Sequence, residues 1–267
     1  MSDREGLLAA IAADPDDDTP RLVLADYLDE RDDPLGEFIR LQMALEPLRI
    51  PRDDPAEELE RHKRLAGIPP SADQRDEDWL VARQRRRERE LLRAHEAEWL
   101  GKAASLEQDS PQTYFGPEFR RGFVASAQVG LTKLGKHGLA IRRCCPALQK
   151  LIVLGTLGRG EELAPCEALA GVPELYLAGW LLKEDASAFV RSRHLKELRA
   201  LTLWIGNQDE EDVCPMLAKL RGLRELTLFQ LYGGIDTESE DPEAYDEHAD
   251  GLAEQVRRLH PGCAVRV

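Results

Sequence analysis

Four aspartates crowd one short segment of the chain, at Asp14 and at Asp16 to Asp18. Clustered carboxylates are the usual ligands of calcium, and an EF-hand loop places a glycine sixth and a glutamate twelfth. Neither residue stands at those places, whether the loop is counted from Asp14 or from Asp16. The segment is therefore interpreted as a solvated loop that caps the following helix.

Other candidate groups for chemistry are scattered along the sequence. Asp26, Asp29 and Glu30 could act as acid/base carboxylates, but their segment supplies no nucleophile, so helix-surface charge with local pairing is favoured. Five cysteines contain no CxxC pair and no zinc-type spacing with histidine, and we interpret them as reduced thiols: Cys144, Cys145, Cys166, Cys214 and Cys263. The sequence thus predicts no catalytic site, no metal and no cofactor; an enzyme whose site forms only in space remains an open alternative.

Two segments of the sequence could bind phosphate. Glycines at 155, 158 and 160 follow the apolar run Leu151–Leu154, but their order matches neither GxGxxG nor GxxxxGK[ST], so a loop is favoured over a nucleotide site. The arginine cluster at 83–93 is interleaved with Glu88, Glu90 and Glu96, as in an exposed, salt-bridged helix. Because the net charge of −14 also opposes phosphate backbones, we expect no nucleic-acid partner.

The first half of the chain reads as helical. Apolar spacing predicts three short helices within residues 1–46, and Thr19-Pro20 predicts the N-cap and first turn of the second. Residues 47–110 are interpreted as a linker with a helix over Ala56–Ala66, followed by a long helix over Trp79–Leu100 that Gly101 ends.

Residues 111–267 contain a repeated apolar pair. The pairs occur at Ala127/Val129, Leu151/Val153, Leu175/Leu177, Leu201/Leu203 and Leu226/Leu228, with first members 24, 24, 26 and 25 residues apart, and at Val265/Val267 after an acidic insertion at 236–250. Helix-compatible segments separate them at Glu161–Leu169, Glu184–Arg193, Glu210–Leu220 and Leu252–Leu259. This period predicts an α/β fold of the leucine-rich-repeat type, a solenoid of parallel strands and outer helices behind an all-α N-terminal domain. A doubly wound nucleotide-binding sheet is the rival interpretation.

The run from Leu7 to Arg31, LLAAIAADPDDDTPRLVLADYLDER, closely resembles the bacterial repeat-companion domain, and the similarity continues through DPLGEFIRLQ at Asp33–Gln42. The segments AEWLG at Ala97–Gly101 and FRRGF at Phe119–Phe123 look like that family's passage into its repeats. The resemblance implies a helical module before degenerate leucine-rich repeats, with no enzymatic activity.

Strand alternation predicts which side chains remain available for binding. If the paired apolar residues point into the core, seven others share the concave face: Gln128, Ile152, Tyr176, Thr202, Trp204, Thr227 and Phe229. Tyr176, Trp204 and Phe229 would form an aromatic patch suited to a protein or peptide partner, unless they pack on one another or under the helical half. A structural or self-assembly role is the alternative function.

Composition limits the location of the protein. With 42% hydrophobic and 32% charged residues, it resembles an ordinary globular protein, and no apolar run approaches the roughly 18 residues of a membrane span. Met1–Glu5 lacks the features of a secretory signal, so a cytoplasmic location is expected.

Overall fold

The computed structural model describes residues 3–48, 72–103, 115–180, 182–206, 210–217, 219–220, 222–231, 254, 257–258 and 263–266. These residues form two compact units. The helical unit comprises Met1–Ala104 with Phe119–Val124, and the sheet unit comprises Ser105–Glu118 with Ala125–Val267. The expected helix over 56–66, the acidic segment 236–250 and most of the expected helix over 252–259 lie outside the described residues.

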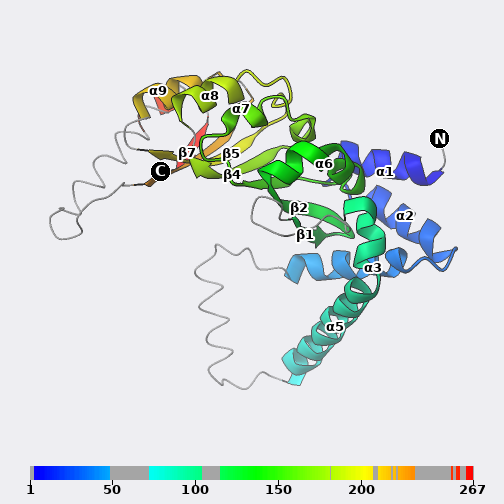
Figure 1. Ribbon diagram of the computed structural model, residues 1–267. Helices are drawn as coiled ribbons and strands as arrows, with labels where there is room; N and C mark the ends of the chain where they lie inside the picture. The colour runs from blue at the N-terminus through cyan, green and yellow to red at the C-terminus, as the bar shows by residue number, and fades with distance from the viewer. Residues whose placement is uncertain are drawn as a thin grey trace. The chain divides into compact units, whose positions relative to one another are not determined.

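The helical unit begins with the three short helices that the sequence predicts: α1 (Asp3–Ala13), α2 (Thr19–Asp29) and α3 (Pro34–Leu45) (Figure 1). Asp18 rather than Thr19 is the N-cap of α2, with Pro20 in its first turn. The Asp17 carboxylate instead accepts a hydrogen bond from the backbone N–H of Thr19, at 2.9 Å. The N-cap prediction was therefore wrong by one residue, because a turn of the aspartate loop already orients this N–H group.

The long helix α5 (Ala72–Leu100) starts earlier than predicted and ends where predicted. Gly101 has a φ of 51°, the left-handed conformation that commonly follows a helix. Trp99 near the end of α5 packs on Phe38 of α3, with ring centroids 4.6 Å apart. Phe119 meets the same Phe38 ring edge-on at 5.7 Å, and the ring centroids of Trp99 and Phe119 are 6.3 Å apart.

A tight turn connects the first two strands, β1 (Phe115–Arg120) and β2 (Phe123–Gly130). Arg121 and Gly122 both have positive φ, 49° and 88°, which is the backbone of a two-residue hairpin turn. Phe119–Phe123 was expected to lead into the first strand, and the separate strand β1 was not predicted.

Within the residues that the structure describes, seven strands form one sheet in sequence order, β1 to β7. The strands after β2 are β3 (Lys150–Leu154), β4 (Glu174–Trp180), β5 (Ala200–Gly206), β6 (Glu225–Leu231) and β7 (Ala264–Arg266). All pairings from β2 to β7 are parallel. A doubly wound sheet reverses its strand order at a switch point, and this sheet has no such reversal, which contradicts the rival interpretation.

The repeated apolar pairs lie opposite one another across the sheet. The first members form one line of register partners from β2 to β7: Ala127, Leu151, Leu175, Leu201, Leu226 and Val265. The second members from Val129 to Leu228 form another line, and all of these side chains are buried. Strand alternation then turns the intervening residues to the other face.

Four helices form a row over one face of the sheet (Figure 1). They are α6 (Leu131–Cys144), α7 (Gly160–Leu163), α8 (Lys183–Phe189) and α9 (Glu210–Leu217), and each contacts the next. The predicted helix over 161–169 is divided into α7 and a 3-10 turn, η4 (Glu167–Leu169), and α6 was not predicted. The chain is thus a mixed α/β protein with a mostly parallel sheet and an N-terminal helical region.

Candidate functional site

Five of the seven predicted binding residues lie in a single line across the sheet. Register pairs join Gln128 to Ile152, Ile152 to Tyr176, Tyr176 to Thr202, and Thr202 to Thr227. Each of the five is half-buried, whereas its neighbours along the strand at the repeated apolar positions are buried. These side chains form the opposite face of the sheet, the face turned away from α6 to α9.

The aromatic positions are close together but do not continue that line. Trp204 lies opposite Phe229, and both come one alternation later along their strands than Thr202 and Thr227. A register shift between Leu177 and Trp180 places Trp180, and not Tyr176, opposite Trp204. Trp180 is not among the binding residues predicted from the sequence. The repeated apolar pair ends at Leu177, and its spacing gives no sign of a bulge.

A direct hydrogen bond still joins two of the predicted aromatic residues. The Trp204 Nε1–H donates to the Tyr176 hydroxyl at 3.1 Å in a part-buried setting. Because this bond occupies the polar group of the indole, a partner would meet mainly the ring surface of Trp204. Trp204 and Tyr176 therefore partly pack on one another, as the sequence analysis allowed.

Charged side chains mark the edge of the opposite face where the strands begin. Lys150 and Glu174 are register partners with opposite charges, and Glu225 occupies the same line on β6; all three are exposed. Along the strand direction, the side chains of this face therefore change from charged residues at the strand starts to the half-buried aromatic residue Trp204 near the strand ends. A surface with this gradient can orient a bound chain as well as hold it.

In the glycine loop after β3, the groups that could bind a phosphate already have partners within the protein. The N–H of Gly160 donates to the Asp185 carboxylate at 2.7 Å, and Asp185 is buried. Arg159 makes two 2.7 Å hydrogen bonds to the Glu162 carboxylate, which raise the pKa of Arg159 and lower that of Glu162. A second anion at this loop would meet a carboxylate, so the geometry supports the loop interpretation.

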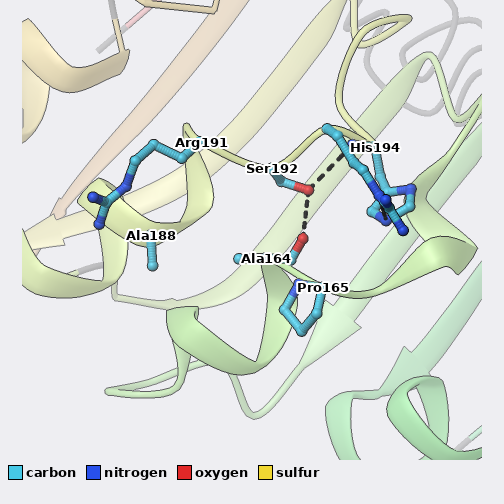
Figure 2. A pocket seen from close by; sticks show the side chains of 7 residues that line it. Ala164, Pro165, Ala188, Arg191, Ser192 and His194 are labelled. Carbon is cyan, nitrogen blue, oxygen red and sulfur yellow. Dashed lines mark hydrogen bonds between the residues drawn. The ribbon is translucent and has the colours of Figure 1, made fainter.

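A shallow pocket of about 480 Å³ lies between the turns that follow α7 and α8 (Figure 2). Ser192 and His194 line it, but they do not form a nucleophile and base. The Ser192 hydroxyl donates to the Ala164 carbonyl at 2.6 Å and accepts from the backbone N–H of His194, while Arg193 Nε contacts the His194 ring at 3.3 Å. Ser192 thus ties two neighbouring turns together and lacks the imidazole contact that would activate it.

The acidic candidates of the helical unit pair with arginines. Arg40 contacts both Asp26 and Asp29, the latter at 2.9 Å, so these two carboxylates bind a neighbouring helix. In the aspartate loop, Asp16 and Asp18 lie 3.8 and 3.4 Å from Arg121. Within the described residues, no group of three or more His, Cys, Asp or Glu side chains is arranged to hold a metal ion.

In the arginine cluster on α5, Arg86 and Arg87 pair with carboxylates. Arg86 pairs with Glu90 one turn later at 3.0 Å, and Arg87 makes two 2.7 Å hydrogen bonds to Glu37 of α3. Glu88 instead accepts a hydrogen bond from Gln42 at 2.8 Å. Arg87 therefore links α5 to α3, whereas Arg89 donates to the Arg85 carbonyl within α5 itself.

Two of the cysteines are core residues with unreactive thiols. Cys145 is fully buried, and burial raises the pKa of its thiol to about 12. Burial also raises the pKa of Cys166, whose Sγ lies 3.9 Å from the Leu134 carbonyl oxygen. Thiolates are the reactive form of cysteine, so these two residues fit the predicted role as core filler.

Comparison of the chain with models of protein families, with curated proteins and with solved structures found no match. In the part of the chain that the structure describes, no helix is both long enough and apolar enough to cross a membrane.

Proposed function

We propose that this protein is a non-catalytic interaction module of the cytoplasm, in which a repeat-companion-like helical module precedes a leucine-rich-repeat-type solenoid. The opposite face of the sheet binds a protein or peptide partner. The observation that carries the proposal is the unbroken line of half-buried side chains from Gln128 to Thr227 across five parallel strands. Repeat proteins bind their partners on extended faces of this kind.

Two features support binding over catalysis. The half-buried line on this face consists of threonines, a glutamine, an isoleucine and a tyrosine, which supply contact area and hydrogen bonds, and the charged Lys150, Glu174 and Glu225 stand apart from it where the strands begin. The shallow pocket near Ser192 lies away from this face, on the turns after α7 and α8, and its serine lacks an activating base.

Affinity capture from a cell extract tests the proposal when variants of the face are compared. A partner recovered by the intact protein is expected to be lost with Trp204→Ala, Phe229→Ala and Ile152→Ser. Leu139→Ala is the matched control, because Leu139 is a half-exposed apolar residue of α6 on the helical side of the sheet. Equal recovery with all four variants would contradict binding on the opposite face.

Self-association is the second candidate, and the short strand β7 favours it. The pairings of β7 join it to three residues of β6, Glu225 to Thr227, and β7 stands at the end of the strand order. Strands at the end of a sheet offer backbone groups to a further strand. Light scattering that gives a monomer mass at all concentrations would remove this candidate.

A further inference from the structure

The helix α6 carries basic side chains and no acidic ones. It is the first helix of the row over the sheet (Figure 1). Its 14 residues contain no Asp or Glu, and they contain five basic residues: Lys133, Lys136, His137, Arg142 and Arg143. Within the sheet unit, α6 is therefore a locally basic element.

The two sides of α6 have different environments. Leu131, Leu134, Gly138 and Ile141 are buried and recur at helical spacing. A Cβ added at Gly138 would lie 2.5 Å from the Cβ of Ala168, so this side of α6 packs tightly on η4. The other side of the helix is free of such packing.

Three exposed residues follow one another along that other side. Lys136, Leu139 and Arg143 are three, four and seven residues apart, which places them on one side of a helix. Leu139 is 50% exposed and lies between the two cations. Gly135 stands one turn before Leu139, and a Cβ added there would have no atom within 4 Å. The α6 outer face is defined as Gly135, Lys136, Leu139 and Arg143.

Both cations of the α6 outer face are available to a partner. Among the residues that the structure describes, Lys136 and Arg143 form no salt bridge and no side-chain hydrogen bond. The absence of a side chain at Gly135 also leaves space beside Leu139, so that an apolar group can reach both the leucine and the helix backbone.

The spacing of these charges favours an acidic helix as the occupant. Lys136 and Arg143 are two turns apart, a distance of about 10 Å along the helix axis. A second helix with carboxylates two turns apart and an apolar residue between them presents the complementary pattern. Apolar contact at Leu139 then supplies affinity, and the two ion pairs supply selection among partners.

The neighbouring elements disfavour a broad anionic surface. Both α7 and η4 contact α6, and they expose Glu161 and Glu167. A membrane or a phosphate backbone that also covered these elements would meet carboxylates within the range of electrostatic interactions. A single helix is only about 10–12 Å wide, so it can lie along α6 alone.

We propose that the α6 outer face is a second interaction surface, which binds an acidic amphipathic helix of another protein. Carboxylates two turns apart pair with Lys136 and Arg143, and an apolar side chain between them packs on Leu139 beside Gly135. This surface lies on the helical side of the sheet, so it is separate from the opposite face and takes a different partner. Variants of Leu139 are therefore expected to retain a partner that binds the opposite face.

Binding of synthetic peptides to the full chain tests the inference by fluorescence anisotropy. The probe is a labelled alanine-based helical peptide of about 20 residues, with leucines and with glutamates every seventh residue on the same side. One companion peptide has the same composition with its glutamates moved to the side opposite the leucines, and another has lysine in place of glutamate.

The protein variants separate local charge from total charge. Lys136→Glu with Arg143→Glu reverses the charges of the α6 outer face, and Leu139→Ser removes its apolar contact. The matched control is Lys150→Glu with Arg224→Glu, two exposed cations outside α6 whose reversal changes the net charge by the same amount.

The glutamate peptide is expected to bind the intact protein, and charge reversal on α6 should weaken this binding by about tenfold or more. The reversed variant should in turn bind the lysine peptide, which also shows that it is folded. Leu139→Ser should weaken the glutamate peptide by about threefold or more, and the matched control should change its affinity less than about twofold.

Three results would overturn the inference: no binding of the glutamate peptide, equal binding of the peptide with its glutamates moved, or equal effects of the α6 reversal and the matched control. Vesicles of phosphatidylserine and phosphatidylcholine, and a DNA duplex, are tested in parallel. If either of them binds through Lys136 and Arg143 while the glutamate peptide does not, the surface recognises phosphate groups and the proposed protein partner is wrong.

Discussion

Side-chain contacts in the two units cover different distances along the chain. In the sheet unit, the hydrogen bonds of Gly160 to Asp185, Ser192 to Ala164 and Trp204 to Tyr176 span 25 to 28 residues, about one strand-to-strand step. In the helical unit, Gln42 bonds to Glu88 and to Gly122, 46 and 80 residues away. The sheet unit is therefore held mostly between neighbours, as in repeat proteins, whereas a few residues of the helical unit fix distant segments.

The two patterns predict different responses to damage. A change in the sheet core should remove one local set of contacts and leave more distant strands intact. A change at the helical clasp, defined as Gln42 and the turn Arg121–Gly122, should loosen several segments together.

The largest loss is expected from Leu203→Ala in the middle of the sheet. Leu203 is fully buried between Leu177 and Leu228, so its truncation should lower the free energy of unfolding by about 2–5 kcal/mol. Thr202→Ala, one residue earlier and half-buried, should cost less than about 1 kcal/mol. Urea unfolding measures both values, and hydrogen exchange should show loosening in β4 to β6 with β2 protected. Similar losses for the two variants would contradict the alternation.

The next effect is expected at the turn of the helical clasp. Gly122→Ala introduces a Cβ at a φ of 88° and 2.3 Å from Ile39 Cγ1. The matched control is Gly158→Ala in the sheet unit, which also has a positive φ, 62°, but has no atom within 4 Å of the added Cβ. Conformational strain alone costs about 1–2 kcal/mol, so Gly122→Ala should exceed Gly158→Ala by at least about 1 kcal/mol. Thermal or urea unfolding measures the difference in stability between the two variants. Equal losses in the free energy of unfolding would show that the Ile39 side chain can move away from the added Cβ at no measurable cost.

A smaller loss is expected from Gln42→Ala. Gln42 is 1% exposed, and it accepts from the Gly122 N–H at 2.8 Å while donating to Glu88 and to the Phe119 carbonyl. Removing it leaves the buried Gly122 N–H without this acceptor, a cost of about 1–3 kcal/mol. Gln128→Ala, half-buried on the opposite face, should stay within about 0.5 kcal/mol. Equal losses of stability for the two variants in urea unfolding would contradict the role of Gln42 in holding the helical clasp together.

The contrast also explains which features were predictable from sequence. The apolar pairs that return at each strand-to-strand step predict the parallel register, because residues two places apart on a strand point to the same face and must align to share one core. The helix α6 was missed since Gly135 and Gly138 weaken its helical pattern. Its packing explains Gly138, where a Cβ would come within 2.5 Å of the Ala168 Cβ.

Features that depend on a single contact between distant residues leave no repeating pattern in the sequence, so they could not be predicted from it. Gln42 reads as one polar residue in an amphipathic helix, and its partners lie 46 to 80 residues away. The bulge that sets Trp180 opposite Trp204 is a local irregularity of β4, and the spacing of the apolar pairs along the sequence does not encode it. The α6 outer face also lay outside the predicted binding set, because that set followed strand positions alone.

The smallest predicted effect is a pH-dependent one at the ion pair between α3 and α5. Hydrogen bonds from Arg87, together with its charge, hold the pKa of Glu37 below its ordinary value. A carboxyl group with a lowered pKa in the folded state stabilises the protein above its unfolded pKa of about 4.3, and this stabilisation is lost as the pH falls through the folded value. Because the Glu37 side chain is 45% exposed, the contribution at pH 7 should be below about 1 kcal/mol.

Glu37→Gln should therefore lower the free energy of unfolding slightly at pH 7 and leave it nearly unchanged at a pH well below 4. Glu162→Gln is the matched variant in the sheet unit, where Glu162 pairs with Arg159 only three residues away. The pair of Glu37 with Arg87 joins helices 50 residues apart in sequence, whereas the Glu162 pair is local. If distant contacts matter more in the helical unit, Glu37→Gln should have the larger effect in urea titrations across this pH range. Equal effects of the two variants, or a loss from Glu37→Gln that persists at low pH, would mean that the ion pair does not distinguish the two units.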